Sequence, residues 1–141
     1  MAAEKVVIDA SVVAKWFLEE VYSTEALLLR DKYIGGEIEL ASPCIMPFEV
    51  LNALRYSGLY SKDVLVGVVK SLEGYGIELW DLRREYGQMV AEVAMDLNIS
   101  VYDASYVALA EIATARLVTA DIELVTKAKD LITVTHLKEL E

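Results

Sequence analysis

The chain has 141 residues, of which 55% are apolar and 26% charged, and it carries a formal net charge of −10. This length suits one domain, which we expect to span residues 1–141, and the apolar content excludes a disordered chain. The negative charge excludes a broad basic surface for nucleic acid, whereas the short uncharged stretches and the absence of a signal-type N-terminus predict a soluble, cytoplasmic protein with no membrane partner.

Short apolar stretches alternate with helix-like segments along the whole chain. Strands are predicted at residues 5–8, 38–41, 77–79, 116–119 and 132–134. Helices are predicted at residues 11–18, 24–34, 47–58, 62–76, 84–97 and 104–115, with Ser23 and Ser61 as N-caps of the second and the fourth. Strands separated by helices are typical of parallel sheets, so we expect an α/β fold, a three-layer α/β/α sandwich with a mainly parallel sheet of about five strands.

Four acidic residues occupy positions that such a fold brings to one edge of the sheet. Asp9 ends the first predicted strand, and Glu49 lies in the first turn of the helix after the second strand. Asp103 opens the helix that leads into the fourth strand, and Asp121 follows that strand. Because a helix that follows a parallel strand begins at the carboxyl end of the strands, we expect these four carboxylates to meet where open α/β sheets bind ligands.

Helix capping is the alternative explanation for each acid taken alone, because Asp is a favoured N-cap and Glu suits a first helical turn. Four converging carboxylates, however, repel one another unless a cation neutralises them. Oxygen ligands without His or Cys favour Mg²⁺ or Mn²⁺, which support phosphodiester hydrolysis. We therefore expect a metal site in which Asp9 and Asp103 bind an ion directly, while Glu49 and Asp121 bind a second ion or orient water.

Neighbouring polar residues are candidate contacts to substrate. Ser11 follows Asp9 by two positions, Thr119 precedes Asp121 by two, and Asn52 lies one helical turn beyond Glu49. Each of the three can bond phosphate or water. The alternative for the serine is a local bond in a first helical turn, and for Asn52 it is an exposed helix face.

Isolated basic residues near the same edge could hold a nucleic-acid backbone. Lys15 lies two helical turns beyond Asp9, and Arg55 lies two turns beyond Glu49. Arg83 and Arg84 precede a predicted helix. The alternative for all four is a solvated side chain on the surface.

Other enzyme classes lack their signatures in this chain. The single Cys44 and the single His136 exclude an internal disulfide, a structural zinc site and a mechanism with two histidines. Neither the P-loop pattern nor the glycine fingerprint of dinucleotide-binding folds is present. The segment VIDAS is similar to the start of aspartyl phosphotransferases, but Ser11 stands where those enzymes carry a second Asp.

Four segments together resemble the PIN-domain ribonucleases. They are VVIDASVVAKWF, PFEVLNAL, SVYDASYVALA and LVTADIELV, and they span nearly the whole chain. Among these, single-domain PIN proteins of this size most resemble the VapC toxins of VapBC toxin–antitoxin modules. The resemblance implies a Mg²⁺- or Mn²⁺-dependent endoribonuclease that hydrolyses RNA phosphodiester bonds, forms a homodimer and is inhibited by a VapB-type antitoxin.

The resemblance also assigns roles to individual residues. Asp9 and Asp103 correspond to the principal metal ligands, Glu49 and Asp121 complete the acidic cluster, and Thr119 matches a small hydroxyl position of the family. The alternative function is a non-catalytic PIN-fold module that binds RNA or protein. The complete set of four acids speaks against it, because a binder gains nothing from negative charge where phosphate must approach.

Overall fold

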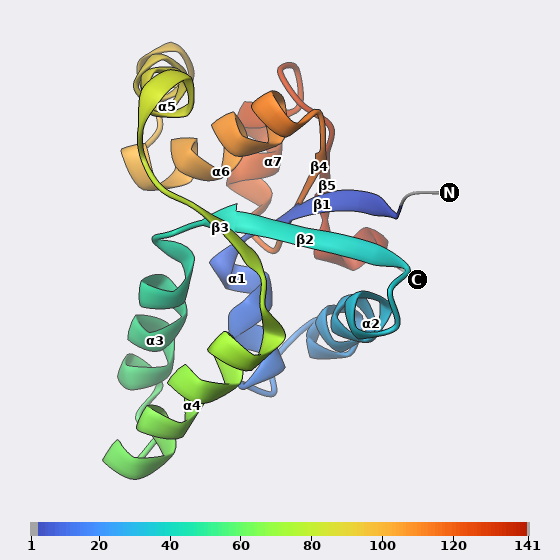
Figure 1. The fold of residues 1–141 in the computed structure, drawn as a ribbon, viewed down its shortest axis with the longest axis vertical. Coiled ribbons are helices and arrows are strands. Elements are labelled where there is room, and N and C mark those ends of the chain that lie inside the picture. Colours follow the sequence, from blue (N-terminus) through green and yellow to red (C-terminus); the bar gives the residue numbers. More distant parts are fainter. Residues whose placement is uncertain (1–2, 141) are drawn as a thin grey trace.

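The computed structural model describes residues 3–140, which form one sheet of five parallel strands covered by helices (Figure 1). The strands are β1 (Glu4–Ile8), β2 (Ile38–Pro43), β3 (Glu78–Trp80), β4 (Arg116–Thr119) and β5 (Val134–His136). Their spatial order is β3-β2-β1-β4-β5, so the first strand of the chain lies at the centre. Because all five run in the same direction, their carboxyl ends form one common edge.

Helices cover both faces of this sheet, which confirms the predicted α/β/α sandwich. Figure 1 shows α5, α6 and α7 on one side and α1, α2, α3 and α4 on the other. The bounds are α1 (Ala10–Val13), α2 (Ser23–Ile34), α3 (Met46–Ser57), α4 (Lys62–Tyr75), α5 (Arg84–Leu97), α6 (Val101–Ala113) and α7 (Ile122–Ala128). Two 3-10 turns, η1 (Ala14–Trp16) and η2 (Leu137–Glu139), complete the described elements. Within residues 3–140, no helix has the length and apolar character needed to cross a membrane.

The core is densest where α6 crosses the central strands. Val6, Val7 and Ile8 of β1 are completely buried. On α6, residues 104–110 are all buried, and this helix contacts β1, β2 and β4. The buried parts of this strand and this helix pack tightly, which fixes the ends that lead into the predicted acidic cluster.

Several predicted bounds agree with the structure, and others differ for local reasons. Strand β4 and helix α5 have the predicted bounds, while β5 begins two residues later than predicted. The predicted helix at residues 11–18 ends as α1 at Val13 and continues as the tighter turn η1. The Trp16 indole N–H donates to the Ala26 carbonyl (2.9 Å), which fixes this turn against α2.

The prediction that Ser23 caps α2 is wrong, whereas the prediction for Ser61 is confirmed. Ser23 is the first residue of the helix, and its hydroxyl donates to the Leu18 carbonyl (2.8 Å) and accepts from the Glu20 N–H (2.9 Å). Its side chain therefore closes the preceding turn and does not satisfy the helix. The Ser61 hydroxyl accepts from the Val64 N–H (3.3 Å), as an N-cap should.

Helix α6 begins three residues earlier than predicted because Ser100 is its N-cap. The Ser100 hydroxyl accepts from the Asp103 N–H (3.0 Å). We expect Ser100→Ala to lower the free energy of unfolding by about 1 kcal/mol, since the N–H loses its partner. Ser100→Thr, which keeps the hydroxyl, is the control and should cost much less. Urea unfolding measures both, and equal stability of Ser100→Ala and the unchanged protein would contradict the assigned cap.

Candidate active site

Asp9 lies directly after β1, and its side chain is buried at the carboxyl edge of the sheet. It occupies the N-cap position of α1, but its side chain accepts no capping hydrogen bond from a backbone N–H of that helix. Its Oδ2 atom instead accepts hydrogen bonds from Thr119 Oγ1 (2.6 Å) and Ser11 Oγ (2.9 Å). Helix capping therefore does not explain why a carboxylate is buried here.

The two hydroxyls that bind Asp9 also bind the turn between β4 and α7. Ser11 Oγ accepts from the Ala120 N–H (3.1 Å), and Thr119 Oγ1 accepts from the Asp121 N–H (3.1 Å). Each hydroxyl thus accepts from the backbone and directs its own proton to the carboxylate. This arrangement fixes the Asp9 side chain against the turn that carries Asp121.

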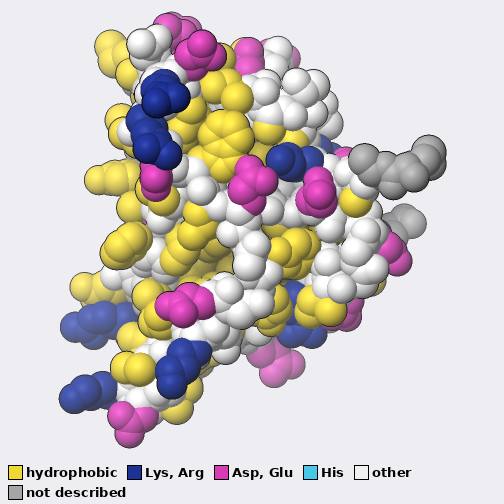
Figure 2. Space-filling model, viewed as in Figure 1, with side chains coloured by type: hydrophobic (Ala, Val, Ile, Leu, Met, Phe, Trp, Pro, Cys, Tyr) yellow, Lys and Arg dark blue, Asp and Glu magenta, His cyan; other side chains and the backbone are white. Residues whose placement is uncertain are grey.

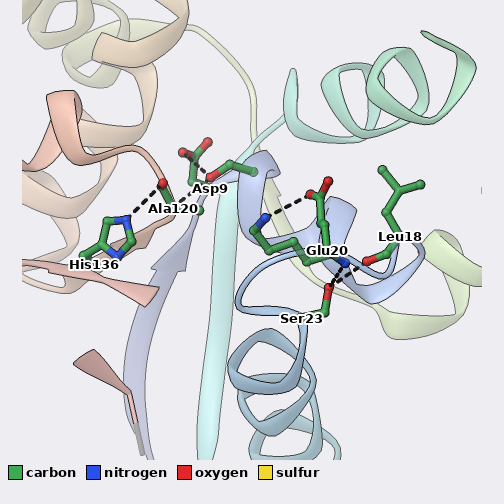
Figure 3. Close-up of polar contacts among 8 residues, drawn as sticks. Asp9, Leu18, Glu20, Ser23, Ala120 and His136 are labelled. Atoms are coloured by element: carbon green, nitrogen blue, oxygen red, sulfur yellow. Dashed lines mark hydrogen bonds and ion pairs between the residues drawn. The ribbon is translucent and has the colours of Figure 1, made fainter. Parts of the chain in front are cut away.

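The single histidine supports this turn from the side opposite Asp9 (Figure 3). His136 Nδ1 accepts from the Lys138 N–H (3.0 Å), so Nε2 carries the proton and donates to the Ala120 carbonyl (3.1 Å). The ring of Tyr22 packs edge-on against the imidazole, with 5.5 Å between the two ring centroids. Both ring nitrogens of His136 are therefore bonded to the backbone, at Ala120 and at Lys138. The sequence alone did not predict this role.

The pKa of Asp9 is raised to about 6, mainly by burial and to a smaller extent by the negative charges of Glu49 and Asp103. The hydrogen bonds from Thr119 and Ser11 lower it, but they do not offset the burial. Among residues 3–140, no Lys, Arg or His forms an ion pair with Asp9. At neutral pH the protein therefore keeps a buried negative charge without a positive partner of its own.

Glu49 approaches this region from α3 and is held by a residue that sequence reasoning missed. The Tyr106 hydroxyl donates to Glu49 Oε1 (2.6 Å), and Tyr106 is only 1% exposed. Burial and the nearby Asp9 raise the pKa of Tyr106, so it remains a protonated donor. Its position three residues after Asp103 on the same helix was the available signal, because residues with this spacing share a helix face.

Asp103 and Asp121 line one shallow hollow of about 250 Å³, which we call the acidic hollow. Burial raises the pKa of Asp103, and the charges of Asp121 and Glu123 raise it further. Lys127 lines the same hollow and lowers this pKa, although its ammonium is paired with Glu123 (3.5 Å). Because Ser100 caps α6, capping does not explain Asp103.

Asp121 does have a capping role. Its Oδ1 atom accepts from the N–H groups of Glu123 (3.0 Å) and Leu124 (3.4 Å) at the start of α7. The capping alternative is therefore correct for this residue. Its second carboxylate oxygen is not used by the cap and remains available to a ligand in the acidic hollow.

The four carboxylates fit a hard divalent cation by their chemistry, although their side chains are not gathered around one point. Within residues 3–140, no three acidic, histidine or cysteine side chains stand close enough together to hold an ion as they are. Tyr106 holds one oxygen of Glu49, and α7 holds one oxygen of Asp121. The remaining oxygens, with the unpaired charge of Asp9, form the donor set that Mg²⁺ and Mn²⁺ prefer.

Three other predicted contact residues form no hydrogen bond or ion pair with these acids within residues 3–140. Asn52 is exposed on α3 and makes no side-chain hydrogen bond within residues 3–140. Lys15 forms an ion pair with Glu20 (2.9 Å), drawn in Figure 3, and Arg55 lies over the ring of Tyr56. The structure therefore brings Ser11 and Thr119 to Asp9 but gives Asn52, Lys15 and Arg55 no such contact.

Comparison with protein families gives a match to the PIN domain over residues 6–130. The chain belongs to the PIN-domain family. A curated relative from Pyrobaculum aerophilum, named Ribonuclease VapC3, is 29% identical, with 92% of this chain and 98% of the relative aligned.

Solved structures show the same fold. A crystal structure of a Pyrobaculum aerophilum protein matches with 26% identity and a TM-score of 0.66, over 98% of this chain and 92% of the other. VapBC2 from Rickettsia felis, solved bound to a fragment of promoter DNA, matches with 14% identity and a TM-score of 0.68, over 94% and 98% of the two chains. FitAcB from Neisseria gonorrhoeae matches with 16% identity and a TM-score of 0.69, over 96% and 99%.

Asp9→Asn should stabilise the metal-free protein at high pH. The pKa of Asp9 is raised from about 4 when unfolded to about 6 when folded, so its ionised form costs stability above pH 6 and this cost disappears as pH falls toward 4. We expect the variant to melt about 5 °C higher than the unchanged protein at pH 8 in EDTA, and at the same temperature at about pH 3.5, where Asp9 is largely protonated in both states. Thermal melts across pH test this, and a variant that melts lower at pH 8 would contradict the unpaired buried charge.

Proposed function

We propose that this protein is a Mg²⁺- or Mn²⁺-dependent endoribonuclease that acts in the cytoplasm as the toxin of a toxin–antitoxin pair. The observation that carries the proposal is the buried carboxylate of Asp9, which forms no ion pair within residues 3–140, together with three further acids, Glu49, Asp103 and Asp121, at the starts of helices on the same edge of the sheet. Membership of the PIN-domain family and the similarity to a relative named Ribonuclease VapC3 support the same function.

In this proposal Asp9 and Asp103 hold a metal ion directly, while Glu49 and Asp121 hold a second ion or orient water. When bound, a divalent cation lowers the pKa of water and neutralises charge on the phosphate. The charge that burial and mutual repulsion make costly in the free protein then becomes the source of affinity for the ion.

The remaining residues of the site orient these carboxylates. Thr119 and Ser11 both donate to Oδ2 of Asp9, which leaves Oδ1 without a side-chain donor and fixes the direction in which it points. Tyr106 likewise fixes Oε1 of Glu49. In metal sites, hydrogen bonds to the ligating side chains hold the ligand oxygens in place before the substrate binds. Direct contact of Ser11, Thr119 or Asn52 with phosphate is part of the proposal for RNA binding.

A VapB-type antitoxin and a second copy of this chain are the proposed partners. The solved structure of VapBC2 from Rickettsia felis supports the first, and exposed apolar side chains on α3 and after it support a covered surface. Phe48, Tyr56 and Leu59 are 70%, 75% and 77% exposed. Figure 2 shows apolar and basic side chains together on the projecting arm at the lower left, which is formed by α3 and α4. Exposed apolar surface of this kind is typical of interaction sites.

Cleavage of RNA should require both the metal and Asp103. We expect the purified protein to cleave a pool of structured and single-stranded RNA with Mn²⁺, and to lose cleavage in EDTA. Asp103→Asn should lower the rate at least about 100-fold, because it removes a ligand charge while α6 keeps its cap at Ser100. Asp96→Asn, which alters an exposed acid on α5, is the matched control and should cleave normally.

The outcomes separate the candidate functions. Cleavage that survives EDTA or Asp103→Asn would contradict the metal-dependent mechanism. RNA binding without cleavage under any metal condition would favour the non-catalytic PIN-fold module. Retention of labelled phosphate on Asp9 would instead indicate a phosphotransferase.

A further inference from the structure

A second hollow of about 200 Å³ lies beside the acidic hollow, on another side of the first turns of α6. Ser100 and Asp103 line the acidic hollow, whereas Tyr102 and Ser105 line this one. The ends of β2 and β3 and the connection from β3 to α5 complete its wall. We call it the aromatic hollow and define it by Pro43, Cys44, Trp80, Leu82, Tyr86 and Tyr102.

The polar groups in this wall are already bonded within the protein. The Tyr86 hydroxyl donates to the Ser105 carbonyl (2.9 Å), and the Ser105 hydroxyl donates to the Tyr102 carbonyl (2.5 Å). The Trp80 indole N–H donates to Glu78 (2.5 Å). Tyr86 is buried and packs edge-on against Trp80, so the hollow offers mainly the exposed ring of Tyr102 and apolar carbon, with few groups that can read hydrogen-bond patterns. Such a surface suits a flat ligand that stacks.

Two arginines adjoin this wall and indicate what the flat ligand is. Arg83 and Arg84 line a neighbouring hollow that shares Trp80 and Tyr86 with the aromatic hollow. Three acids, Glu78, Asp81 and Glu85, line that neighbouring hollow as well. Arg84 forms no ion pair with any residue in 3–140, and Arg83 has only an exposed contact with Asp81 at 3.7 Å. Figure 2 shows basic side chains next to apolar ones along the connection from β3 to α5, at the upper left.

The backbone in this connection is also unusual. Arg84 has a φ of 58°, in the left-handed region that a residue with a side chain seldom adopts. Strain of this kind persists where the surrounding structure holds it and is frequent at binding sites. In a chain of net charge −10, two arginines without strong partners beside an aromatic wall complement phosphates that flank a base.

We infer that the aromatic hollow binds one unstacked base of single-stranded RNA next to the scissile phosphate, while Arg83 and Arg84 bind the flanking backbone. This inference rests on the proposed ribonuclease function and names a subsite for it. An apolar side chain of a protein partner would also fill the hollow, but it would not use the two arginines. Because the wall has few free donors and acceptors, the subsite binds any base with similar affinity. A nucleotide that lacks its base should bind more weakly.

The test compares RNA with and without bases. Full-length Asp103→Asn protein, chosen so that RNA stays intact, is titrated with Mg²⁺ present against labelled single-stranded oligomers of A, of U, and of abasic ribose-phosphate. We expect the A and U oligomers to bind within about threefold of each other and the abasic oligomer about tenfold more weakly. The exposed residues Tyr102 and Leu82 are then changed to Ala in this background.

Each variant has a distinct expected effect. Tyr102→Ala and Leu82→Ala should each lower affinity for the A and U oligomers about tenfold and leave the abasic affinity unchanged, whereas Arg84→Gln should weaken all three equally. Met95→Ala, at an exposed apolar residue of α5 outside the hollow, is the control and should change nothing. Equal binding of all three oligomers, or unchanged affinities in Tyr102→Ala and Leu82→Ala, would overturn the inference and leave the hollow to a protein side chain.

Cleavage by the unaltered protein with Mn²⁺, measured on the same A and U oligomers, separates the two proposals. If the protein cleaves the A and U oligomers but binds the abasic oligomer with the same affinity as these two, only the base subsite is overturned. If no oligomer is bound or cleaved, the ribonuclease function fails as well.

Discussion

The structure depends on one buried carboxylate at the end of its central strand. β1 pairs with β2 and β4, and its last three residues are completely buried, so the position of the next residue, Asp9, is closely fixed. Two hydroxyls, from Ser11 and Thr119, bind the same oxygen of Asp9 and are themselves held by backbone N–H groups of the β4–α7 turn. The central strand of the sheet therefore ends at a negative charge that no basic side chain within residues 3–140 neutralises.

The surroundings of Asp9 are built to keep that charge unsatisfied in the free protein. Glu49 and Asp103 add negative potential, and Tyr106 holds Glu49 in place from inside the core. A buried charge without a partner lowers stability. A protein selected only for stability would therefore pair Asp9 with a Lys or an Arg, or carry an apolar residue in place of Asp9. The same cost becomes binding free energy once a cation enters, so the instability of the free site and its proposed function have one physical origin.

Much of this arrangement was predictable from the sequence, because it follows from topology. The alternation of strands and helices predicted the parallel sheet, and the sheet alone brings Asp9, Glu49, Asp103 and Asp121 to one edge. The side-chain contacts were not predictable in the same way. Nothing local distinguishes a serine that caps a helix, as Ser100 does, from one that closes the turn before it, as Ser23 does, because the choice depends on neighbours distant in sequence. Tyr106 was missed because its hydroxyl donates to Glu49, a residue that lies 57 positions earlier in the sequence and on a different helix.

Calorimetric titration of Mn²⁺ into the unaltered protein and into Asp9→Asn at pH 7.5 tests the central claim most directly. We expect the unaltered protein to bind Mn²⁺ and to melt at a higher temperature as the ion is added, since the ion binds the folded state. Asp9→Asn, which lacks the buried charge, should bind the ion at least about tenfold more weakly. Equal Mn²⁺ binding by the two proteins would show that Asp9 is not a metal ligand, and no binding by either would contradict the metal site itself.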